Sequence, residues 1–201
     1  MSRNDKTSHA SQPDDEALIK EFLANNARAF DRLVVKHQSM VLNLCFRIIG
    51  DYDEANDCAQ ETFIKVYNNL KKFRFQSSFS TWLYRIAINT CRNRLASSDN
   101  RRKKKTVRID NPSDVDGETL DINDCSFNPV AVFEKNEDSL LIHKAISSLP
   151  DELRVLVVLR DLEGKSYEEI SDMTGVNLGT VKSRLARARH ILRESLREVF
   201  A

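Results

Sequence analysis

The stretch Ser166–Ala188, which reads SYEEISDMTGVNLGTVKSRLARA, decides the fold class of this chain. It predicts two short helices joined by a tight turn. Ser166 and Glu169 have the spacing of a capping box, so a helix should follow Ser166 directly. Gly175 stands where that helix should end and where a positive φ angle suits glycine, and Asn177 can cap a second helix. The pattern is that of a helix-turn-helix.

The second helix of this motif has two faces of different chemistry. One face is apolar and must pack against the preceding helices: Val181, Leu185, Ala188 and Leu192. The other carries short hydroxyls and long cations, which suit close approach to guanine edges and phosphates in the major groove. We expect DNA to bind Thr180, Lys182, Ser183, Arg184 and Arg187. A solvated basic helix that packs against an acidic partner is the alternative interpretation.

Composition places this motif in a mostly helical protein. The chain has 201 residues, of which 41% are hydrophobic and 30% charged, and it contains only 5 Gly and 4 Pro. Its longest apolar runs are far too short to cross a bilayer, and Met1–Asp15 lacks the apolar core of a secretory signal peptide. We therefore expect a cytoplasmic protein without membrane insertion.

The sequence offers no constellation for catalysis or for metal binding. Its four cysteines form no C-x-x-C pair, and its histidines add no ligand spacing: Cys45, Cys58, Cys91 and Cys125. Three of the cysteines fall on apolar helix faces, where a free thiol behaves as a small hydrophobic group. There is no Gly-rich phosphate loop and no nucleophile motif. We expect no catalytic residues, no metal and no cofactor, and hence no enzyme.

Charge and helical periodicity divide the chain into segments. The net charge of +1 hides basic stretches at Arg92–Arg108 and Lys182–Arg197, which suggests contact with a polyanion at two places. We expect an all-α chain of two small helical domains joined by a flexible acidic linker. The expected divisions are a disordered tail (1–13), a first domain (14–105), the linker (106–136) and the helix-turn-helix domain (137–201).

Apolar spacing and capping residues predict the helices of both domains. A weak helix near Asp14–Ala24 should be followed by one from Phe30 that stops at Gly50. Further expected features are a helix capped by Asp53 with Tyr67 on its buried side, a loop over Phe73–Phe79, a helix capped by Ser80 that runs to about Leu95, a helix from Ser139, and a helix that starts at Pro150 and continues to Gly164.

Two helices of the first domain present polar faces. With Ala59, Phe63 and Val66 inward, the polar residues that should project outward are Asp57, Gln60, Glu61 and Lys65. On the helix after the loop, Arg85, Asn89, Arg92 and Asn93 share one face, where Asn can pair with a base edge and Arg can hold the backbone. Solvated helix surface is the simpler interpretation of both faces. Trp82 is either core or a base-stacking residue, and its place in the first turn favours core.

Three segments resemble sigma factors of the extracytoplasmic-function group. Asp53–Phe63 is similar to the sigma helix that docks on the polymerase's largest subunit, and Phe79–Arg94 resembles the segment that melts and reads the −10 element. Ser166–Ile170 with Gly179–Arg189 looks like the domain that reads the −35 element, and the two halves are joined only by a tether, as in that compact group.

The resemblance implies roles for the two domains, as sigma regions 2 and 4. Core RNA polymerase would bind Asp57, Gln60, Glu61 and Lys65, and the −35 element would bind the basic helix of the helix-turn-helix. The opened −10 strand would bind Phe75, Gln76, Ser77, Arg85, Asn89, Arg92 and Asn93, with a flipped base held between that helix and the loop.

The implied function is a sigma factor that binds bacterial core RNA polymerase and promoter DNA, assists promoter melting, initiates transcription of a stress or envelope-type regulon, and is controlled by an anti-sigma factor. The alternative function is a free-standing helix-turn-helix regulator, which would bind duplex DNA by itself, usually as a dimer on a palindrome.

Overall fold

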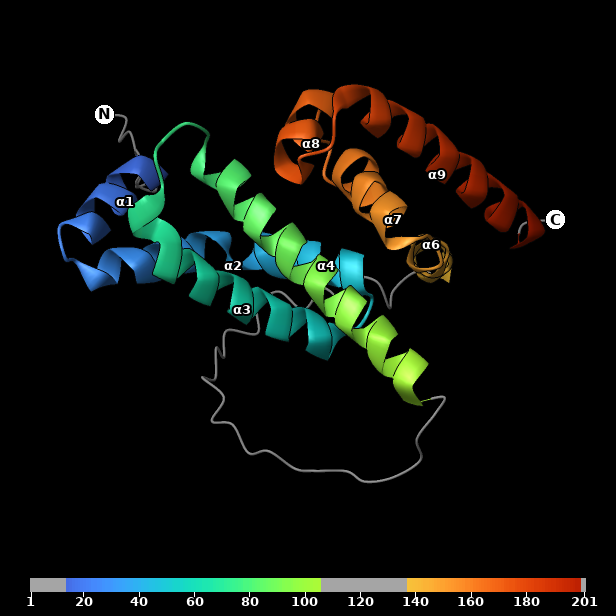
Figure 1. Cartoon of the computed structure of the whole chain (residues 1–201), viewed down its shortest axis with the longest axis horizontal. Helices are drawn as coiled ribbons and strands as arrows, with labels where there is room; N and C mark the ends of the chain where they lie inside the picture. The colour runs from blue at the N-terminus through green and yellow to red at the C-terminus, as the bar shows by residue number, and fades with distance from the viewer. Residues whose placement is uncertain (1–13, 106–136, 200–201) are drawn as a thin grey trace, which may run out of the picture.

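The computed structural model describes residues 14–105 and 137–199, and within these ranges all regular structure is helical (Figure 1). The helices are α1 (Asp15–Leu23), α2 (Ala27–Ile49), α3 (Tyr52–Asn69), α4 (Phe79–Lys105), α6 (Glu137–Ser147), α7 (Asp151–Val157), α8 (Tyr167–Thr174) and α9 (Leu178–Val199), with a 3-10 turn η1 (Leu70–Lys72) and a π-helical turn η2 (Val158–Leu162). The all-α fold class is confirmed. The expected tail and acidic linker lie outside the described residues.

The turn between α2 and α3 is built from Gly50 and Asp51. Gly50 adopts a left-handed conformation with φ of 88°, and it ends α2 as the sequence predicts. The side chain of Asp51 accepts a hydrogen bond from the Glu54 amide at 2.9 Å and so caps α3. The prediction that Asp53 is the cap was wrong, because α3 begins at Tyr52 and Asp53 lies in its first turn.

Helix α4 starts earlier and ends later than the sequence predicts. It begins at Phe79, and the Ser78 hydroxyl accepts a hydrogen bond from the Thr81 amide at 3.1 Å, in place of the expected cap at Ser80. It continues to Lys105 rather than stopping near Leu95. Its last turns are rich in Arg and Lys, which favour a helix even where no apolar stripe marks one.

The core of the N-terminal half contains three free cysteines, one from each of α2, α3 and α4: Cys45, Cys58 and Cys91. A hydrogen bond with Cys91 and burial both raise the pKa of the Cys58 thiol far above its ordinary value. These thiols are therefore inert core groups, as expected. Cys125 lies outside the described residues. Within 14–105 and 137–199, no three His, Cys, Asp or Glu residues are grouped so that they could hold a metal ion.

Aromatic rings fill the space beneath the loop between η1 and α4. The ring centroid of Trp82 lies 5.2 Å from that of Phe73 and 6.0 Å from that of Phe79, so Trp82 packs onto the core, as its sequence position favours. Tyr67 differs from its prediction as a buried residue, because it is 49% exposed. It lies on the rim of α3, where its ring packs edge-on against Phe22 and Phe30.

The sequence predicts one regular helix between Pro150 and Gly164, but this prediction was wrong. Pro150 is the N-cap of α7, and the helix widens into the π-helical turn η2 at Val158. The wider turn is closed by a hydrogen bond of 2.9 Å from the Glu163 amide to the Val158 carbonyl. Gly164 then ends the segment with φ of 67°.

The C-terminal helices pack directly against the N-terminal ones. Helix α7 lies between α9 on one side and α2 and α4 on the other, while α8 lies against α4 (Figure 1). All residues of α7 from Leu153 to Val157 are buried. This packing was not predicted, since the sequence suggested two domains separated by a tether. In the part of the chain that the structure describes, no helix is both long and apolar enough to span a bilayer.

Candidate nucleic-acid interface

The helix-turn-helix consists of α8 and α9, and each local signal predicted for it is present. The Ser166 hydroxyl accepts a hydrogen bond from the Glu169 amide at 3.1 Å, and the Glu169 carboxylate accepts one from the Ser166 amide at 2.7 Å. These bonds from Ser166 lower the pKa of Glu169. Gly175 turns the chain with φ of 70°, and the Asn177 side chain caps α9 by accepting from the Thr180 amide at 2.8 Å.

The two faces of α9 are separated as the sequence predicts. The apolar stripe is buried against the neighbouring helices: Val181, Leu185 and Ala188. On the opposite side Lys182, Ser183 and Arg187 are exposed, and Thr180 is partly exposed. Arg184 differs from its prediction, because its guanidinium lies 2.9 Å from the carboxylate of Glu152 on α7 instead of pointing freely outward. Arg184 therefore has a competing anionic partner within the chain.

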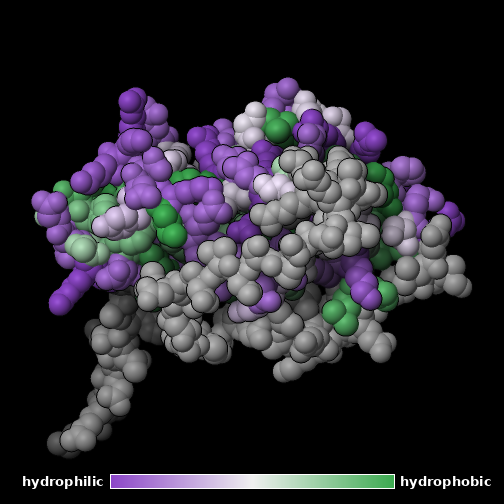
Figure 2. Space-filling view, turned by 60° about the horizontal axis from the view of Figure 1, so that its bottom comes forward, coloured by the Kyte–Doolittle hydropathy of each residue, from purple (hydrophilic) through white to green (hydrophobic). Residues whose placement is uncertain are grey.

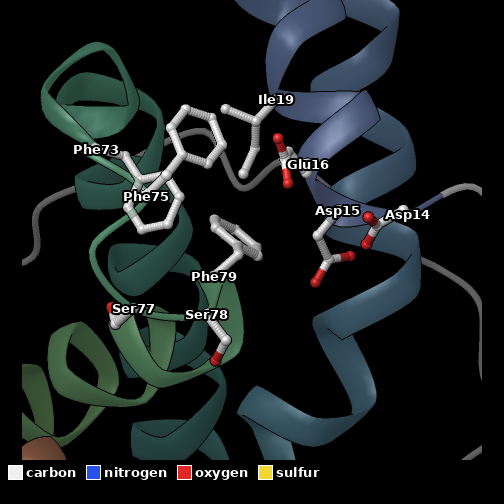
Figure 3. A pocket seen from close by; sticks show the side chains of 9 residues that line it. All are labelled: Asp14, Asp15, Glu16, Ile19, Phe73, Phe75, Ser77, Ser78 and Phe79. Carbon is white, nitrogen blue, oxygen red and sulfur yellow. The ribbon is translucent and has the colours of Figure 1, made fainter.

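A second candidate surface lies at the loop between η1 and α4. A pocket opens between this loop and α1 (Figure 3), lined by Asp14, Asp15, Glu16, Ile19, Phe73, Phe75, Ser77, Ser78 and Phe79. Two of the three loop residues predicted to bind DNA, Phe75 and Ser77, line it. Gln76 is exposed outside the lining. Phe75 adopts φ of 55° and is 42% exposed, so its ring stands at the surface.

Helix α1 supplies one wall of this pocket, which was not predicted from the sequence. Burial would raise the pKa of Asp15, but hydrogen bonds from Lys36 at 2.7 Å and His37 at 3.0 Å outweigh it and lower the pKa. Asp15 is therefore held as a carboxylate by two residues of α2. The signal in the sequence was weak, because Asp14–Glu16 reads as an ordinary acidic first turn.

The polar face predicted for α4 lies partly beneath α8. Asn89 and Asn93 are exposed on it. The Arg85 guanidinium donates a hydrogen bond from Nε to the Asp172 carbonyl of α8 at 2.6 Å. Burial lowers the pKa of Arg92, and the charges of Glu152 and Arg184 act on the same group. The C-terminal half thus occupies part of this face.

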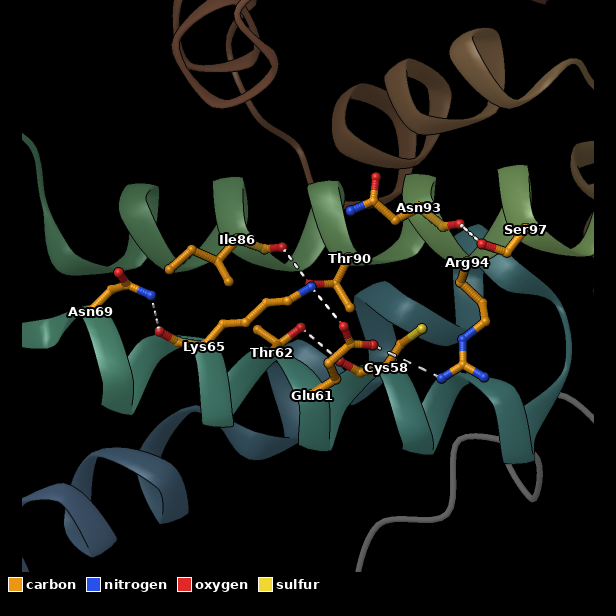
Figure 4. A network of polar contacts seen from close by, with 10 residues as sticks. All are labelled: Cys58, Glu61, Thr62, Lys65, Asn69, Ile86, Thr90, Asn93, Arg94 and Ser97. Carbon is orange, nitrogen blue, oxygen red and sulfur yellow. Dashed lines mark hydrogen bonds and ion pairs between the residues drawn. The ribbon is translucent and has the colours of Figure 1, made fainter. Parts of the chain in front are cut away.

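The face of α3 that is predicted to bind a partner forms a network of polar contacts with α4 (Figure 4). The Lys65 amine donates to the Thr90 hydroxyl at 3.1 Å and lies 2.8 Å from the Glu61 carboxylate. Arg94 lies 3.6 Å from Asp57 and 4.0 Å from Glu61. Lys65 therefore does not project outward as predicted, because Thr90 and Glu61 hold it between the helices.

The outer side of α3 has an apolar residue that the sequence interpretation missed. Ile64 is 61% exposed and lies one turn after Gln60, away from the buried stripe of the helix. The spacing of Ile64 from the buried residues of α3 could have indicated in the sequence that this side chain faces outward. Figure 2 shows hydrophobic atoms at the surface of the end of the molecule formed by α1–α3. This surface offers both apolar and charged contacts to a partner.

Comparison with known proteins gives matches to both halves. Residues 33–101 match the family model of sigma-70 region 2, and residues 139–192 match that of sigma-70 region 4. The RNA polymerase sigma-H factor of Pseudomonas aeruginosa is 38% identical over 185 residues, which cover 92% of this chain and 95% of that protein. The ECF RNA polymerase sigma-E factor of Haemophilus influenzae is 34% identical over 188 residues, covering 93% and 97%.

Two solved structures share the fold. CnrH in complex with the cytosolic domain of CnrY has a TM-score of 0.61 at 22% identity, covering 92% of this chain and 97% of that one. The sigma factor RpoE from Bartonella quintana, solved in complex with the anti-sigma factor NepR, has a TM-score of 0.57 at 24% identity, covering 85% and 98%.

Proposed function

The chain belongs to the extracytoplasmic-function (ECF) sigma factors of bacterial RNA polymerase, and we propose that it divides promoter recognition between the polar faces of α9 and α4. It is a promoter-recognition factor for transcription initiation. The observation that carries the division is the order of the two family matches, region 2 over 33–101 and region 4 over 139–192. A free-standing regulator is not favoured, since such a protein needs only the second.

Helix α9 is the proposed reader of the −35 element in duplex DNA. Asn177 caps its first turn, and its buried stripe turns Lys182, Ser183 and Arg187 outward together. An arginine can bind the O6 and N7 atoms of guanine in the major groove, whereas a lysine at the margin suits a phosphate. Thr180 and Arg184 complete the proposed surface, Arg184 after release from Glu152.

Helix α4 and the loop before it are the proposed −10 reader. Asn89 and Asn93 are exposed on the helix that follows a pocket walled by Phe73, Phe75 and Phe79. Aromatic side chains can stack on any unpaired base, whereas polar side chains can distinguish one base edge from another. Gln76, Ser77, Arg85 and Arg92 complete the proposed surface, with the two arginines binding the backbone of the opened strand.

Core polymerase is the proposed partner of α3. Asp57, Gln60 and Glu61 lie on its outer side with Ile64, and an exposed isoleucine among polar groups adds apolar area to a partner surface. Lys65 contributes indirectly by holding Glu61. Glu61 pairs with both Lys65 and Arg94, whereas among the described residues Asp57 pairs with Arg94 alone, so Asp57 and Gln60 are better sites for mutations that should leave the fold intact.

We also propose an anti-sigma factor as a regulator, since one solved neighbour carries such a partner. The proposed setting is the cytoplasm, the proposed regulon is of a stress or envelope type, and the proposed chemistry is the polymerase's own, with no catalytic residue in this chain.

Reconstitution with purified core RNA polymerase tests the proposal. The chain should form a complex with core and start transcription at a subset of promoters in a random promoter library, with fixed sequences near −10 and −35. The variant Asp57→Ala/Gln60→Ala should retain its melting temperature and lose competition for core. A chain that binds palindromic duplex DNA as a dimer, and that fails to start transcription with core, would instead be a free-standing regulator.

A further inference from the structure

The α1 wall of the pocket beside the loop before α4 carries carboxylates. Asp15 lies across the pocket from the rings of Phe75 and Phe79 (Figure 3). Its neighbours Asp14 and Glu16 also line the pocket, and among the described lining residues there is no lysine, arginine or amide side chain. A carboxylate accepts hydrogen bonds and donates none. An occupant of this pocket must therefore bring its own donors to the α1 wall.

The Asp15 carboxylate is held in place by two residues of α2. Its Oδ1 atom lies 2.7 Å from the Lys36 amine and accepts a hydrogen bond from the His37 ring at 3.0 Å. Burial alone would raise the pKa of Asp15, but these bonds lower it, so the group stays charged. In the described part of the chain no donor is bonded to the second oxygen, Oδ2. One oxygen therefore anchors the side chain, and the other is left for a ligand.

His37 connects the carboxylate to the aromatic wall of the pocket. Its side chain is buried, and the ring that bonds to Asp15 packs edge-on against Phe79, with 5.3 Å between the ring centroids. Phe79 in turn packs against Phe73, with 6.1 Å between their centroids. A flat ligand stacked in this pocket would thus meet a carboxylate whose position relative to the rings is set by the fold.

The charge and shape of the pocket favour a base over a phosphate. Aromatic side chains stack on an unpaired base, whereas the three carboxylates of the lining repel a phosphate. Arg74 is exposed between Phe73 and Phe75 but outside the lining, where it suits the backbone of the same strand. Cytosine, adenine and guanine each carry an exocyclic amine that donates hydrogen bonds, whereas thymine has carbonyl oxygens in these places, which a carboxylate repels.

We propose that Asp15 is a specificity-determining residue for the opened −10 strand. Its Oδ2 atom accepts a hydrogen bond from the exocyclic amine of the base that enters the pocket, and thymine is rejected there. This role rests on the proposed −10 role of the loop before α4. It adds a residue of α1 to that surface and assigns base choice within the pocket to a carboxylate, whereas Asn89 and Asn93 lie on the helix after it.

Base analogues test this role in the intact chain. The full chain with core polymerase is bound to promoter DNA selected in transcription, with the −10 non-template strand left unpaired. At each −10 position in turn, the base is replaced by the analogue that lacks only the exocyclic amine: 2-pyrimidinone for cytosine, purine for adenine and hypoxanthine for guanine. We expect one position to lose roughly tenfold in affinity without the amine, since hydrogen bonds to charged groups are strong. The absence of any such position would overturn the proposal.

Asp15→Asn tests whether the carboxylate reads that position. The amide keeps an oxygen for Lys36 and His37 and places an N–H donor where Oδ2 stood. We expect the preference at that position to invert, so that thymine binds at least as well as the amine-bearing base. Glu21→Gln is the matched control, because Glu21 also lies on α1 and pairs with α2, through Arg32 at 3.5 Å, but does not line the pocket. Its base preference should match that of the parent.

Phe75→Ala is a second variant that does not alter the contacts between α1 and α2. Phe75 is exposed, and its loss removes the stacking wall opposite Asp15. The penalty for the missing amine should shrink at the same position and stay unchanged at all others. A penalty that survives in Phe75→Ala would place the amine outside the pocket and would overturn the proposal even if Asp15→Asn failed to fold.

The remaining outcomes separate base choice from the sigma function. If Asp15→Asn keeps the melting temperature and the base preferences of the parent, or loses affinity equally for all bases, Asp15 is a structural residue only and the sigma function stands. If the parent fails to start transcription with core, the sigma function itself is wrong.

Discussion

The polar faces of α9 and α4 are both proposed to read promoter DNA, yet their surroundings differ. On α9, Lys182, Ser183 and Arg187 face solvent. On α4, Arg85 is bound to α8 and Arg92 is half-buried beneath α7. The difference indicates that the polar face of α9 is open to a partner, whereas the C-terminal helices cover part of the polar face of α4.

The largest expected effect is on stability and comes from Arg154, a buried residue of α7 that bonds to the end of α2. Arg154→Met removes a guanidinium that donates hydrogen bonds to the carbonyls of Ile48 at 2.8 Å, Ser147 at 2.6 Å and Leu149 at 3.0 Å. A buried acceptor that loses its donor costs about 1–3 kcal/mol, so we expect the free energy of unfolding to fall by about 3 kcal/mol or more. Urea denaturation followed by circular dichroism measures the change.

Arg160→Met is the control for the loss of an arginine in the same segment. Arg160 donates a single hydrogen bond to the Lys165 carbonyl at 2.7 Å and makes a cation–π contact with Tyr167, both within the C-terminal half. We expect its cost to be nearer 1 kcal/mol. Equal costs for the two variants would show that Arg154 contributes no more than a local bond.

Local chemistry explains why the α9 face was predicted and the covering of α4 was not. Ser166, Glu169, Gly175 and Asn177 act on neighbours within a few residues, so their spacing in the sequence is enough to place α8 and α9. The contact between Arg85 and Asp172 joins residues far apart in sequence. No periodicity reports such a pair, and the acidic linker suggested separation instead.

The same distinction explains the smaller errors. The cap at Asp51 was missed because Asp53 fits the same rule two positions later, and the rule does not decide between them. Helix geometry predicts that Lys65 points outward, but its long flexible side chain bends toward Glu61 on its own helix and Thr90 on α4. Helix spacing predicts where a Cβ points and not where a lysine amine ends.

Two arginines of α9 differ in their surroundings. Arg187 is exposed, whereas Arg184 is paired with Glu152. Arg187→Ala should relax the preference at one −35 position by ~1–3 kcal/mol, as for a lost guanine contact. Arg184→Ala should have a smaller effect, because binding must first separate Arg184 from Glu152. Holoenzyme binding to duplexes with each −35 base changed measures both.

Glu152→Gln is the matched control for that pair. It frees Arg184 without touching the α9 surface, so we expect slightly tighter −35 binding and an unchanged base preference. If Arg184→Ala and Arg187→Ala both left the −35 preference profile intact, the assignment of α9 to the major groove would be wrong.

The capping box gives a smaller effect that is confined to the helix-turn-helix. Ser166→Ala should reduce stability by ~1 kcal/mol, within the usual range for a lost N-cap. The pKa of Glu169 is lowered in the folded chain by its bonds with Ser166. The Glu169 carboxylate therefore stabilises the folded chain at a pH above the pKa that this group has in the unfolded chain. This stabilisation is lost as the pH falls through the lower pKa of the folded chain. Acid titration of helicity should show that loss in the parent and not in Glu169→Gln.

The smallest effect concerns Lys182, at the margin of the exposed α9 face. If Lys182 touches a phosphate, Lys182→Ala should weaken holoenzyme binding evenly across −35 sequences and lower the slope of log affinity against log salt by about one unit. Lys165→Ala is the matched control, because the Lys165 amine lies over Tyr84 between the halves and not on α9. Its salt slope should match the parent. An unchanged slope for Lys182→Ala would remove Lys182 from the interface, whereas a sequence-dependent loss would place it on a base. Only a loss that is uniform across −35 sequences, together with the lower salt slope, fits a phosphate contact by Lys182.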